Sequence, residues 1–539
     1  MARPPLPSFI GDLVADRRAA GALLAGMVAL FAAGMDPKVM APMATTTQAA
    51  IRARPEIEGL ILLVSVLTAV LLLVGGAVGD TRRARPIIIG GLSVSLACGI
   101  AVLLLADPGG GLFRVVRFVG IASAAMVMPV SLAMAATSYT GIPRATAIGI
   151  AYAAYGLGQG LSPTLIALIP GTYAPAFIGS IVACALALVV VRRRVPDLPR
   201  PTRAERPYVY GTALWACGVV LISAGVLWLG GGLDNPLRIG LILAGIGLVV
   251  VFFLWERRRR EENAESVRIE RRPVTIALFV GLVIAIAQIV PMSQLPLYFG
   301  VGMQYGPVFG MVALAPLFAA LVVAGPIAGF LLARYQPRHL IAGGMLAIGL
   351  GDILLAAVIG PRTTYFAFIV PLLLVGAGFV VATTVRTAII FASVPRGLPA
   401  TAAALNEASI EVGTRAGIVV VTGLIAEVAV TVYTASLAGQ PQAQVDGLVA
   451  TFRDVLIALG TPSFQAITIP HADIAVYKAA YFAGVQVAML GAGAIGVLGS
   501  VIAWFTLGRR NPLQTVYEHR DERVSADEPV SAAEVSAAG

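Results

Sequence analysis

Apolar runs recur along nearly the whole chain and are separated by short polar segments. A run of about 20 apolar residues is long enough to cross a hydrocarbon core of about 30 Å as a helix. A chain in lipid must satisfy its backbone hydrogen bonds internally, which a helix does. The pattern predicts an all-α integral membrane protein with fourteen transmembrane helices, at residues 20–43, 59–79, 86–106, 112–136, 144–168, 173–191, 208–229, 237–255, 274–299, 307–333, 339–360, 364–391, 400–432 and 477–506.

The composition excludes a soluble globular protein. Of the 539 residues, 58% are hydrophobic and only 12% are charged, and the mean hydropathy is +0.89. The net charge of +10 comes from arginines in short loops and not from one basic face, so we expect no nucleic-acid partner. We expect a monomer that contacts membrane lipid.

The arginines also predict an orientation. Placing both ends in the cytoplasm puts most arginine-rich loops inside, as the positive-inside rule requires. The protein is then a multi-pass protein of the inner (cytoplasmic) membrane. Residues 1–19 form a cytoplasmic amphipathic lead-in, and residues 507–539 form a polar cytoplasmic tail.

Two basic stretches divide the chain. Residues 192–207 and 256–273 flank the seventh and eighth spans, which predicts a helix pair (208–255) inserted between two six-helix halves. The predicted halves cover residues 20–191 and 274–506. The second half contains a long external loop, 433–476, in which VDGLVATFRDVLIALG has near-helical apolar spacing. This segment either lies along the outer membrane surface or packs as an extracellular helix.

The two halves carry an internal repeat. PRATAIGIAYAAYGLG from Pro143 matches LPATAAALNEASIEVG from Leu398, and GAVGDTRRARPI from Gly76 matches GFLLARYQPRHL from Gly329. Duplicated halves with a site between them are typical of carriers that work by alternating access.

Four local motifs resemble the major facilitator superfamily, in particular its 14-helix drug:proton antiporter branch, and the resemblance covers about residues 20–506. The loop after the second span resembles G-x-L-a-D-R-x-G-R-R, although Thr81 and Arg83 depart from that motif. The resemblance implies a conformational latch between helices. The alternative is a solvated turn that obeys the positive-inside rule. The residues assigned to the latch are Gly76, Asp80, Arg82, Arg83, Arg85 and Arg386.

The other three motifs lie in spans four, five and one. RFVGIASAAMVMP places Arg117 as in the family's R-x-x-Q-G motif, which implies a role in proton coupling; the alternative is an arginine that snorkels. Gly149, Gly158 and Pro163 partly match the antiporter motif, and they also suit close packing and a bend. GMDPKVMAPM resembles L-D-x-T-I-V-N, which implies that Asp36 faces a central cavity, unless the helix ends early at Pro37.

A charged stripe interrupts span thirteen. In LNEASIEVGTRAG, Glu407, Glu411 and Arg415 are four residues apart and share one helix face about 80° wide. Glu411 and Arg415 can neutralise each other, which leaves Glu407 as a titratable acid unless Arg386 neutralises it. The residues assigned to proton coupling are Asp36, Arg117, Glu407, Glu411 and Arg415.

The predicted function is proton-coupled export of amphipathic or hydrophobic small molecules, of the multidrug-efflux type. Cationic residues at Lys38, Arg117, Arg386 and Arg415 keep open a carrier of lipids or amphipathic organic acids, and a non-transporting scaffold or sensor is a further alternative. The residues assigned to the substrate cavity are Asp36, Lys38, Tyr152, Tyr155, Gln159, Gln288, Gln294 and Asp352, although Asp352 can instead accept hydrogen bonds from a neighbour. No nucleotide-binding loop and no catalytic or metal-ligand constellation is visible in the spans, so we expect neither an enzyme nor a cofactor.

Overall fold

The computed structural model describes most of the chain. Apart from a few isolated residues, the described stretches are 16–52, 56–105, 111–140, 142–168, 174–195, 236–262, 271–303, 312–332, 334–394, 398–458 and 474–507. The side chains of residues 36–67 and of some others lie outside this description. All regular structure in these stretches is helical, and eight of the helices are long and apolar enough to cross a membrane.

The first half is built from six helices that agree closely with the expected spans. They are α2 (Arg17–Arg52), α3 (Glu56–Thr81), α4 (Ala84–Leu104), α5 (Gly111–Thr137), α6 (Ile142–Leu168) and α7 (Ala174–Arg194). The backbone of α2 stays helical past Pro37, so the early end considered for this helix does not occur. The last turn of α7 carries Arg192, Arg193 and Arg194, which suit the negative end of the helix dipole.

The second half also contains six long helices. They are α10 (Arg271–Leu297), α12 (Ala315–Leu331), α13 (Pro337–Val358), α14 (Ile369–Ser393), α15 (Pro399–Ser436) and α18 (Ile474–Thr506). A π-helical turn, η1 (Tyr298–Gly302), follows α10, and a 3-10 turn, η2 (Tyr365–Phe368), precedes α14. The helix α12 begins eight residues later than expected from 307, and Pro316 occupies its first turn, where its missing N–H is tolerated.

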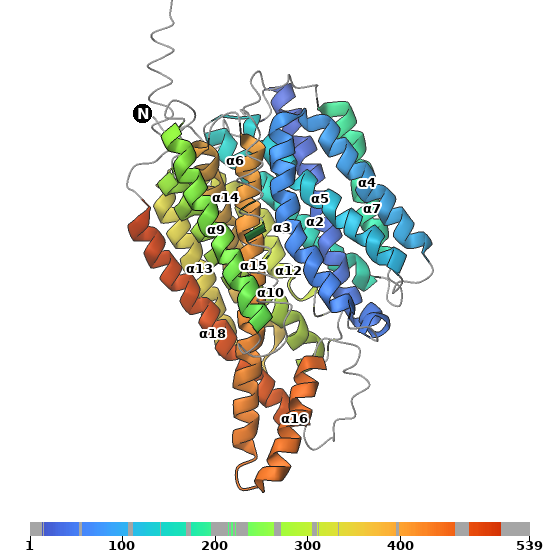
Figure 1. Ribbon diagram of the computed structural model, residues 1–539, viewed down its shortest axis with the longest axis vertical. Helices are drawn as coiled ribbons and strands as arrows, with labels where there is room; N and C mark the ends of the chain where they lie inside the picture. The colour runs from blue at the N-terminus through green and yellow to red at the C-terminus, as the bar shows by residue number, and fades with distance from the viewer. Residues whose placement is uncertain are drawn as a thin grey trace, which may run out of the picture.

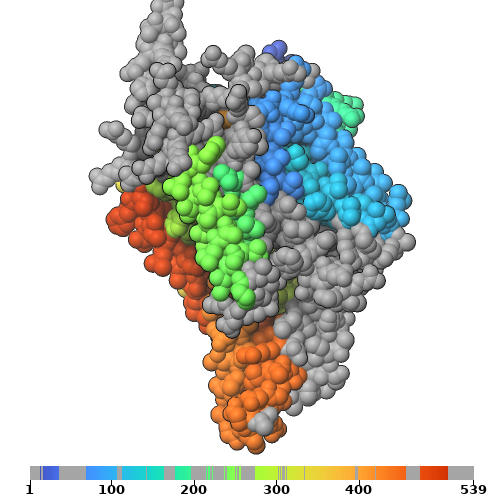
Figure 2. Space-filling view, in the orientation of Figure 1, coloured from blue at the N-terminus to red at the C-terminus, as the bar shows by residue number. Residues whose placement is uncertain are grey.

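The inserted pair is described only in part. Its second helix is α9 (Pro236–Glu262), which lies on the face turned to the viewer in Figure 2. Apart from residues 214, 217, 218 and 221, the expected span at 208–229 lies outside the described residues, as do most of the lead-in and the polar tail.

The two halves meet along pairs of helices that are distant in sequence. In Figure 1 the helices α4, α5 and α7 lie on one side of the molecule, and α13 and α18 lie on the other. Between the halves, α6 packs against α12, and α15 packs against α3 and α5. Glycine makes the α6–α12 contact close: a Cβ atom added at Gly149 would lie 2.0 Å from the carbonyl oxygen of Gly325. Neither position therefore has room for a side chain in this arrangement.

The helix α15 extends well beyond the bundle. Its 38 residues span about 57 Å at 1.5 Å per residue, roughly twice the thickness of a hydrocarbon core. Its far end packs with α16 (Gln442–Ala458) and the start of α18, and the three helices project from the bundle in Figures 1 and 2. The ring centroids of Tyr433 and Phe452 are 4.5 Å apart, and those of Phe452 and Tyr477 are 4.8 Å apart. The helix expected in residues 433–476 is therefore packed against its neighbours, and its extracellular position stays a prediction.

Candidate functional site

A buried carboxylate from one half is hydrogen-bonded to a tyrosine from the other. Glu407, on α15, is 4% exposed, and its Oε1 atom accepts a hydrogen bond from the hydroxyl of Tyr152, on α6. The side-chain amide of Asn406 donates to the same oxygen at 2.9 Å and to the Tyr152 hydroxyl oxygen at 2.6 Å. Two hydrogen-bond donors to one oxygen stabilise the ionised form of a carboxylate.

Thr387, on α14, extends this network. Its Oγ1 atom lies 3.0 Å from the amide oxygen of Asn406 and 3.3 Å from the Tyr152 hydroxyl. The same atom lies 2.7 Å from the carbonyl oxygen of Thr383, one turn earlier in the helix. Because a hydroxyl group has a single proton, Thr387 donates to only one of these oxygens at a time, so the network has more than one hydrogen-bond arrangement.

A fully buried arginine lies next to this network. Arg386 is 0% exposed, and its guanidinium group donates to the Ser409 hydroxyl at 2.9 Å, to the Asn406 carbonyl at 3.1 Å and to the Ala277 carbonyl at 3.3 Å. A Cβ atom at Gly281 would lie 2.1 Å from Nη1 of Arg386, so the absence of a side chain there leaves room for the guanidinium. The arginine ties α14 to α10 and α15, and its charge acts on Glu407. Sequence reasoning assigned Arg386 to the latch and also considered that it neutralises Glu407; the structure has it in this buried network beside Glu407.

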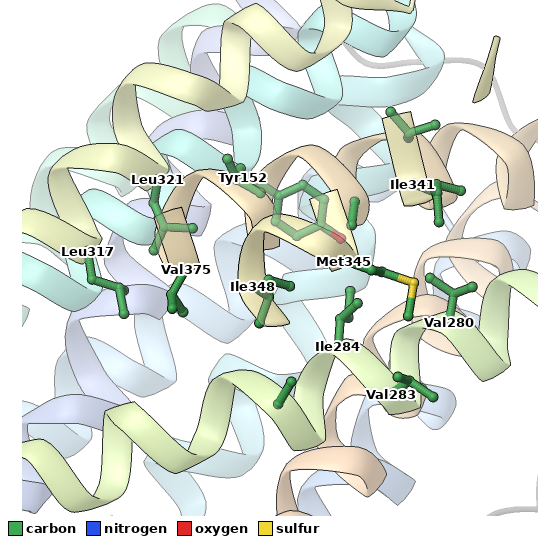
Figure 3. Close-up of a cluster of buried hydrophobic side chains, with 14 of the residues drawn as sticks. Tyr152, Val280, Val283, Ile284, Leu317, Leu321, Ile341, Met345, Ile348 and Val375 are labelled. Carbon is green, nitrogen blue, oxygen red and sulfur yellow. The ribbon is translucent and has the colours of Figure 1, made fainter. Parts of the chain in front are cut away.

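The ring of Tyr152 lies among apolar side chains of the second half. Figure 3 shows Tyr152 beside Ile284, Met345 and Ile348, which come from α10 and α13, and all four belong to one buried cluster. In such surroundings an unpaired polar group is costly, so the hydroxyl and the carboxylate each depend on the partners described above.

A second polar group on α6 lies one turn further along. Tyr155 is hydrogen-bonded to Gln159 and lies within electrostatic reach of both Glu411 and Glu407. Glu411 is partly exposed, whereas the side chain of Arg415 lies outside the described residues. The predicted stripe on α15 therefore turns its first two acids toward the tyrosines of α6.

The two halves are also joined where α3 ends and α15 begins. The carboxylate of Asp80 accepts the backbone N–H of Ala400 at 2.7 Å and that of Thr401 at 2.8 Å. Asp80 thus caps the first turn of α15 from another helix and places its negative charge at the positive end of the helix dipole. Gly76 lies one turn earlier, where a Cβ atom would meet the Ala404 side chain at 2.5 Å.

Comparison with known proteins identifies the family. The family model described as Major Facilitator Superfamily matches residues 22–418 of this chain. The chain belongs to the major facilitator superfamily. Its members are multi-pass membrane transporters of small molecules and not enzymes.

Three similar proteins illustrate this membership. The puromycin resistance protein pur8 of Streptomyces alboniger is 30% identical over 397 residues, which cover 70% of this chain and 76% of that protein. A triacylglyceride transporter of Mycolicibacterium hassiacum is 28% identical over 284 residues, which cover 50% of this chain and 49% of that protein. The crystal structure of the human organic anion transporter MFSD10 shares the fold with a TM-score of 0.56 at 14% identity, covering 90% of this chain and 99% of that one.

Arg117 and Gln294, two other residues predicted for this facilitator-superfamily chain, contact Phe177 and Tyr481. Arg117 is 5% exposed, and its guanidinium lies over the ring of Phe177 with 5.0 Å to the centroid. Gln294 accepts from the Tyr481 hydroxyl at 3.4 Å, and Gln288 is 8% exposed. The side chains of Asp36 and Lys38 lie outside the described residues.

Asp352 and the loop arginines are further residues that the sequence predicted for the cavity and the latch. Asp352 is 0% exposed, and neither of its carboxylate oxygens has a hydrogen-bond partner among the described residues. Arg85 donates to the carbonyl of Arg192 at 2.9 Å, at the end of α7, while Arg82 and Arg83 are exposed.

Sequence reasoning missed the residues that complete the network around Glu407. Asn406, Ser409 and Thr387 are common polar residues in helices, where their hydroxyl or amide groups often bond to their own backbone. One signal was available, because Asn406 directly precedes Glu407 in an otherwise apolar helix.

Proposed function

We propose that this transporter exports amphipathic or hydrophobic small molecules in exchange for protons. The observation that carries the proposal is the hydrogen bond from Tyr152 of the first half to buried Glu407 of the second. A titratable group that bonds across the two halves changes its environment whenever the halves move apart, which is the requirement for coupling protons to alternating access.

The coupling follows from competition for one oxygen. While the halves are together, Tyr152 occupies a donor position on Glu407. When they separate, Glu407 loses this donor, and an ionised carboxylate that is short of partners in a low-dielectric interior costs several kcal/mol. Either a proton or a donor group of the substrate then takes the place of the tyrosine. Because the two compete for the same carboxylate, binding of one releases the other.

The Asp80 contact supports the assignment of a cytoplasmic gate. With both ends of the chain in the cytoplasm, as the arginine distribution predicts, the α3–α15 junction faces the cytoplasm, and we propose that the Asp80 contact closes the entrance there. Opening toward the cytoplasm then requires the cap on α15 to break. Inward movement of a proton through the protein supplies about 2.3 kcal/mol per 100 mV of membrane potential, in addition to the pH gradient.

Proton release on ligand addition tests this proposal. Cationic, neutral and anionic amphiphiles are added to the purified protein in weakly buffered detergent solution, and the pH change is recorded. In the wild type we expect release of up to one proton per bound ligand. In Glu407→Gln we expect ligand binding without release, because the amide cannot titrate.

Glu427→Gln is the matched control, since Glu427 lies on the same helix but is exposed. It should release protons as the wild type does. Unchanged release from Glu407→Gln would overturn the assignment of Glu407, and binding without release in the wild type would overturn proton coupling.

A second candidate substrate class is lipid or amphipathic organic acids. The observation in its favour is the similarity to the protein named a triacylglyceride transporter. Displacement of a bound fluorescent amphiphile distinguishes the classes: displacement by triacylglycerol or fatty acid, and not by cationic dyes, would favour the lipid carrier. The reverse preference would favour drug export.

A further inference from the structure

The end of the second half where α13 begins and α18 ends carries a cluster of basic and aromatic side chains. The guanidinium of Arg338 lies 5.2 Å from the ring centroid of Trp504, and the ring of His339 lies 4.9 Å from it. Trp504 is 43% exposed and Phe505 is 79% exposed. The proposed function uses none of these residues.

The internal repeat shows that this cluster differs from its counterpart in the first half. In the repeat, Arg338 corresponds to Arg85 and Ala333 corresponds to Asp80. Arg85 donates to the Arg192 carbonyl within the protein, and Asp80, five positions earlier in the chain, accepts from the start of α15. The second half lacks this acid, since the equivalent position is alanine.

Among the described residues, no group balances the charge of Arg338. No carboxylate lies within ion-pair distance of it among the described residues, and its buried Nε atom has no hydrogen-bond partner there. Arg334 is close by in sequence, and its guanidinium lies over the Phe330 ring at 4.7 Å instead of over an acid. Arg334, just before α13, and Arg338, in its first turn, thus give this end of the helix two positive charges.

The first turn of α13 adds to this charge. It contains no acidic residue, and the N-cap residue Gln336 makes no side-chain hydrogen bond to it. No acidic side chain of this turn therefore neutralises the positive end of the helix dipole, and that end can attract an external anion. Next to it, α18 presents an exposed apolar strip to the surroundings, formed by Leu498, Val501, Ile502 and Phe505.

We infer that this face binds an anionic phospholipid of the cytoplasmic leaflet. The phosphate lies at Arg338 and the start of α13, and the acyl chains lie along the apolar strip of α18. Charge complementarity supports this occupant, because the cytoplasmic leaflet is negatively charged and attracts basic clusters near the membrane surface. Trp504 lies between the two parts of the lipid, at the interfacial level where tryptophan is enriched. The inference uses the orientation given by the arginine distribution and is independent of proton coupling.

Lipid-dependent stability of the full-length protein tests this inference. The melting temperature is measured in mixed micelles with dioleoyl phosphatidylglycerol or with dioleoyl phosphatidylcholine, and native mass spectrometry counts the lipids that stay bound. For the wild type we expect a higher melting temperature with phosphatidylglycerol and at least one retained lipid. The difference between the two lipids should shrink as salt is added, because screening weakens exposed charge interactions.

Arg338→Gln should lose most of the difference between the two lipids, and Arg85→Gln, at the matched position of the first half, should keep it. If Arg338→Gln fails to fold, Trp504→Leu replaces it, with a partial loss expected. An unchanged difference in Arg338→Gln would overturn the inference. So would an equal shift with inorganic phosphate, or a doubled mass, which would mean that a free anion or a second copy occupies the face.

Discussion

Asp80 and Thr401 are 321 positions apart in the chain, and the carboxylate of Asp80 accepts the backbone N–H of Thr401 at 2.8 Å. With the neighbouring bond to Ala400, this contact fastens the end of α3 to the first turn of α15. Each half contributes one side of the contact, so in the proposed transport cycle its strength contributes to the balance between closed and open arrangements.

Asp80→Asn should loosen this junction. Asparagine offers one acceptor oxygen in place of two and carries no charge, so we expect the cap to weaken by about 1 kcal/mol. Hydrogen–deuterium exchange of the peptide that begins at Pro399 should become about fivefold faster, because RT is about 0.6 kcal/mol. Asp446→Asn, an exposed acid on α16, is the control and should leave this exchange rate unchanged. Equal exchange in both variants would show that Asp80 does not hold the junction.

Gly149→Ala should prevent the close approach of α6 and α12. The new methyl group would lie 2.0 Å from the Gly325 carbonyl oxygen, so the two helices must move apart at a cost of about 1–3 kcal/mol. We expect the initial transport rate in proteoliposomes to fall at least tenfold while the protein still folds. The control is Gly90→Ala, where nothing lies within 4 Å of the new atom. Wild-type transport by Gly149→Ala would mean that this contact is not needed in the cycle.

Asp352→Leu should raise the stability of the protein. The carboxyl group of Asp352 is fully buried without a hydrogen-bond partner among the described residues, and an unsatisfied buried polar group costs about 1–3 kcal/mol. Leucine has the same branching and removes that cost, so we expect a melting temperature a few degrees above the wild type. A lower melting temperature would show that the acid has a partner or a ligand, which would favour its predicted place in the substrate cavity.

Phe452→Ala should unfold α16 without unfolding the bundle. Phe452 is 0% exposed and contacts Tyr433 and Tyr477, and truncation of such a residue costs about 3–5 kcal/mol. We expect fast deuterium exchange throughout α16 and unchanged exchange in α13. Thr451→Ala, next in sequence but exposed, should exchange as the wild type does. Slow exchange in α16 of Phe452→Ala would show that contacts other than those of Phe452 stabilise α16.

Helix positions were predictable because the constraints on them are local. A bilayer sets the length of an apolar run, and the absence of water forces the backbone into helices, so the ends of α4 and α5 agree with the pattern to within two residues. The late start of α12 was not predicted, since the residues before Pro316 are as apolar as the helix itself. Hydropathy alone does not separate a helix from the turn that precedes it.

The amino-acid order also determined which acids share a face, because a helix places Glu407 and Glu411 on one side whatever surrounds it. It could not determine their partners. Tyr152 meets Glu407 across 255 positions, and Arg386 donates to Ser409 on the next helix, because both contacts depend on how α6, α14 and α15 pack. Burial decides the chemistry of these groups, and burial follows from the packing of the two halves, which local pattern does not encode.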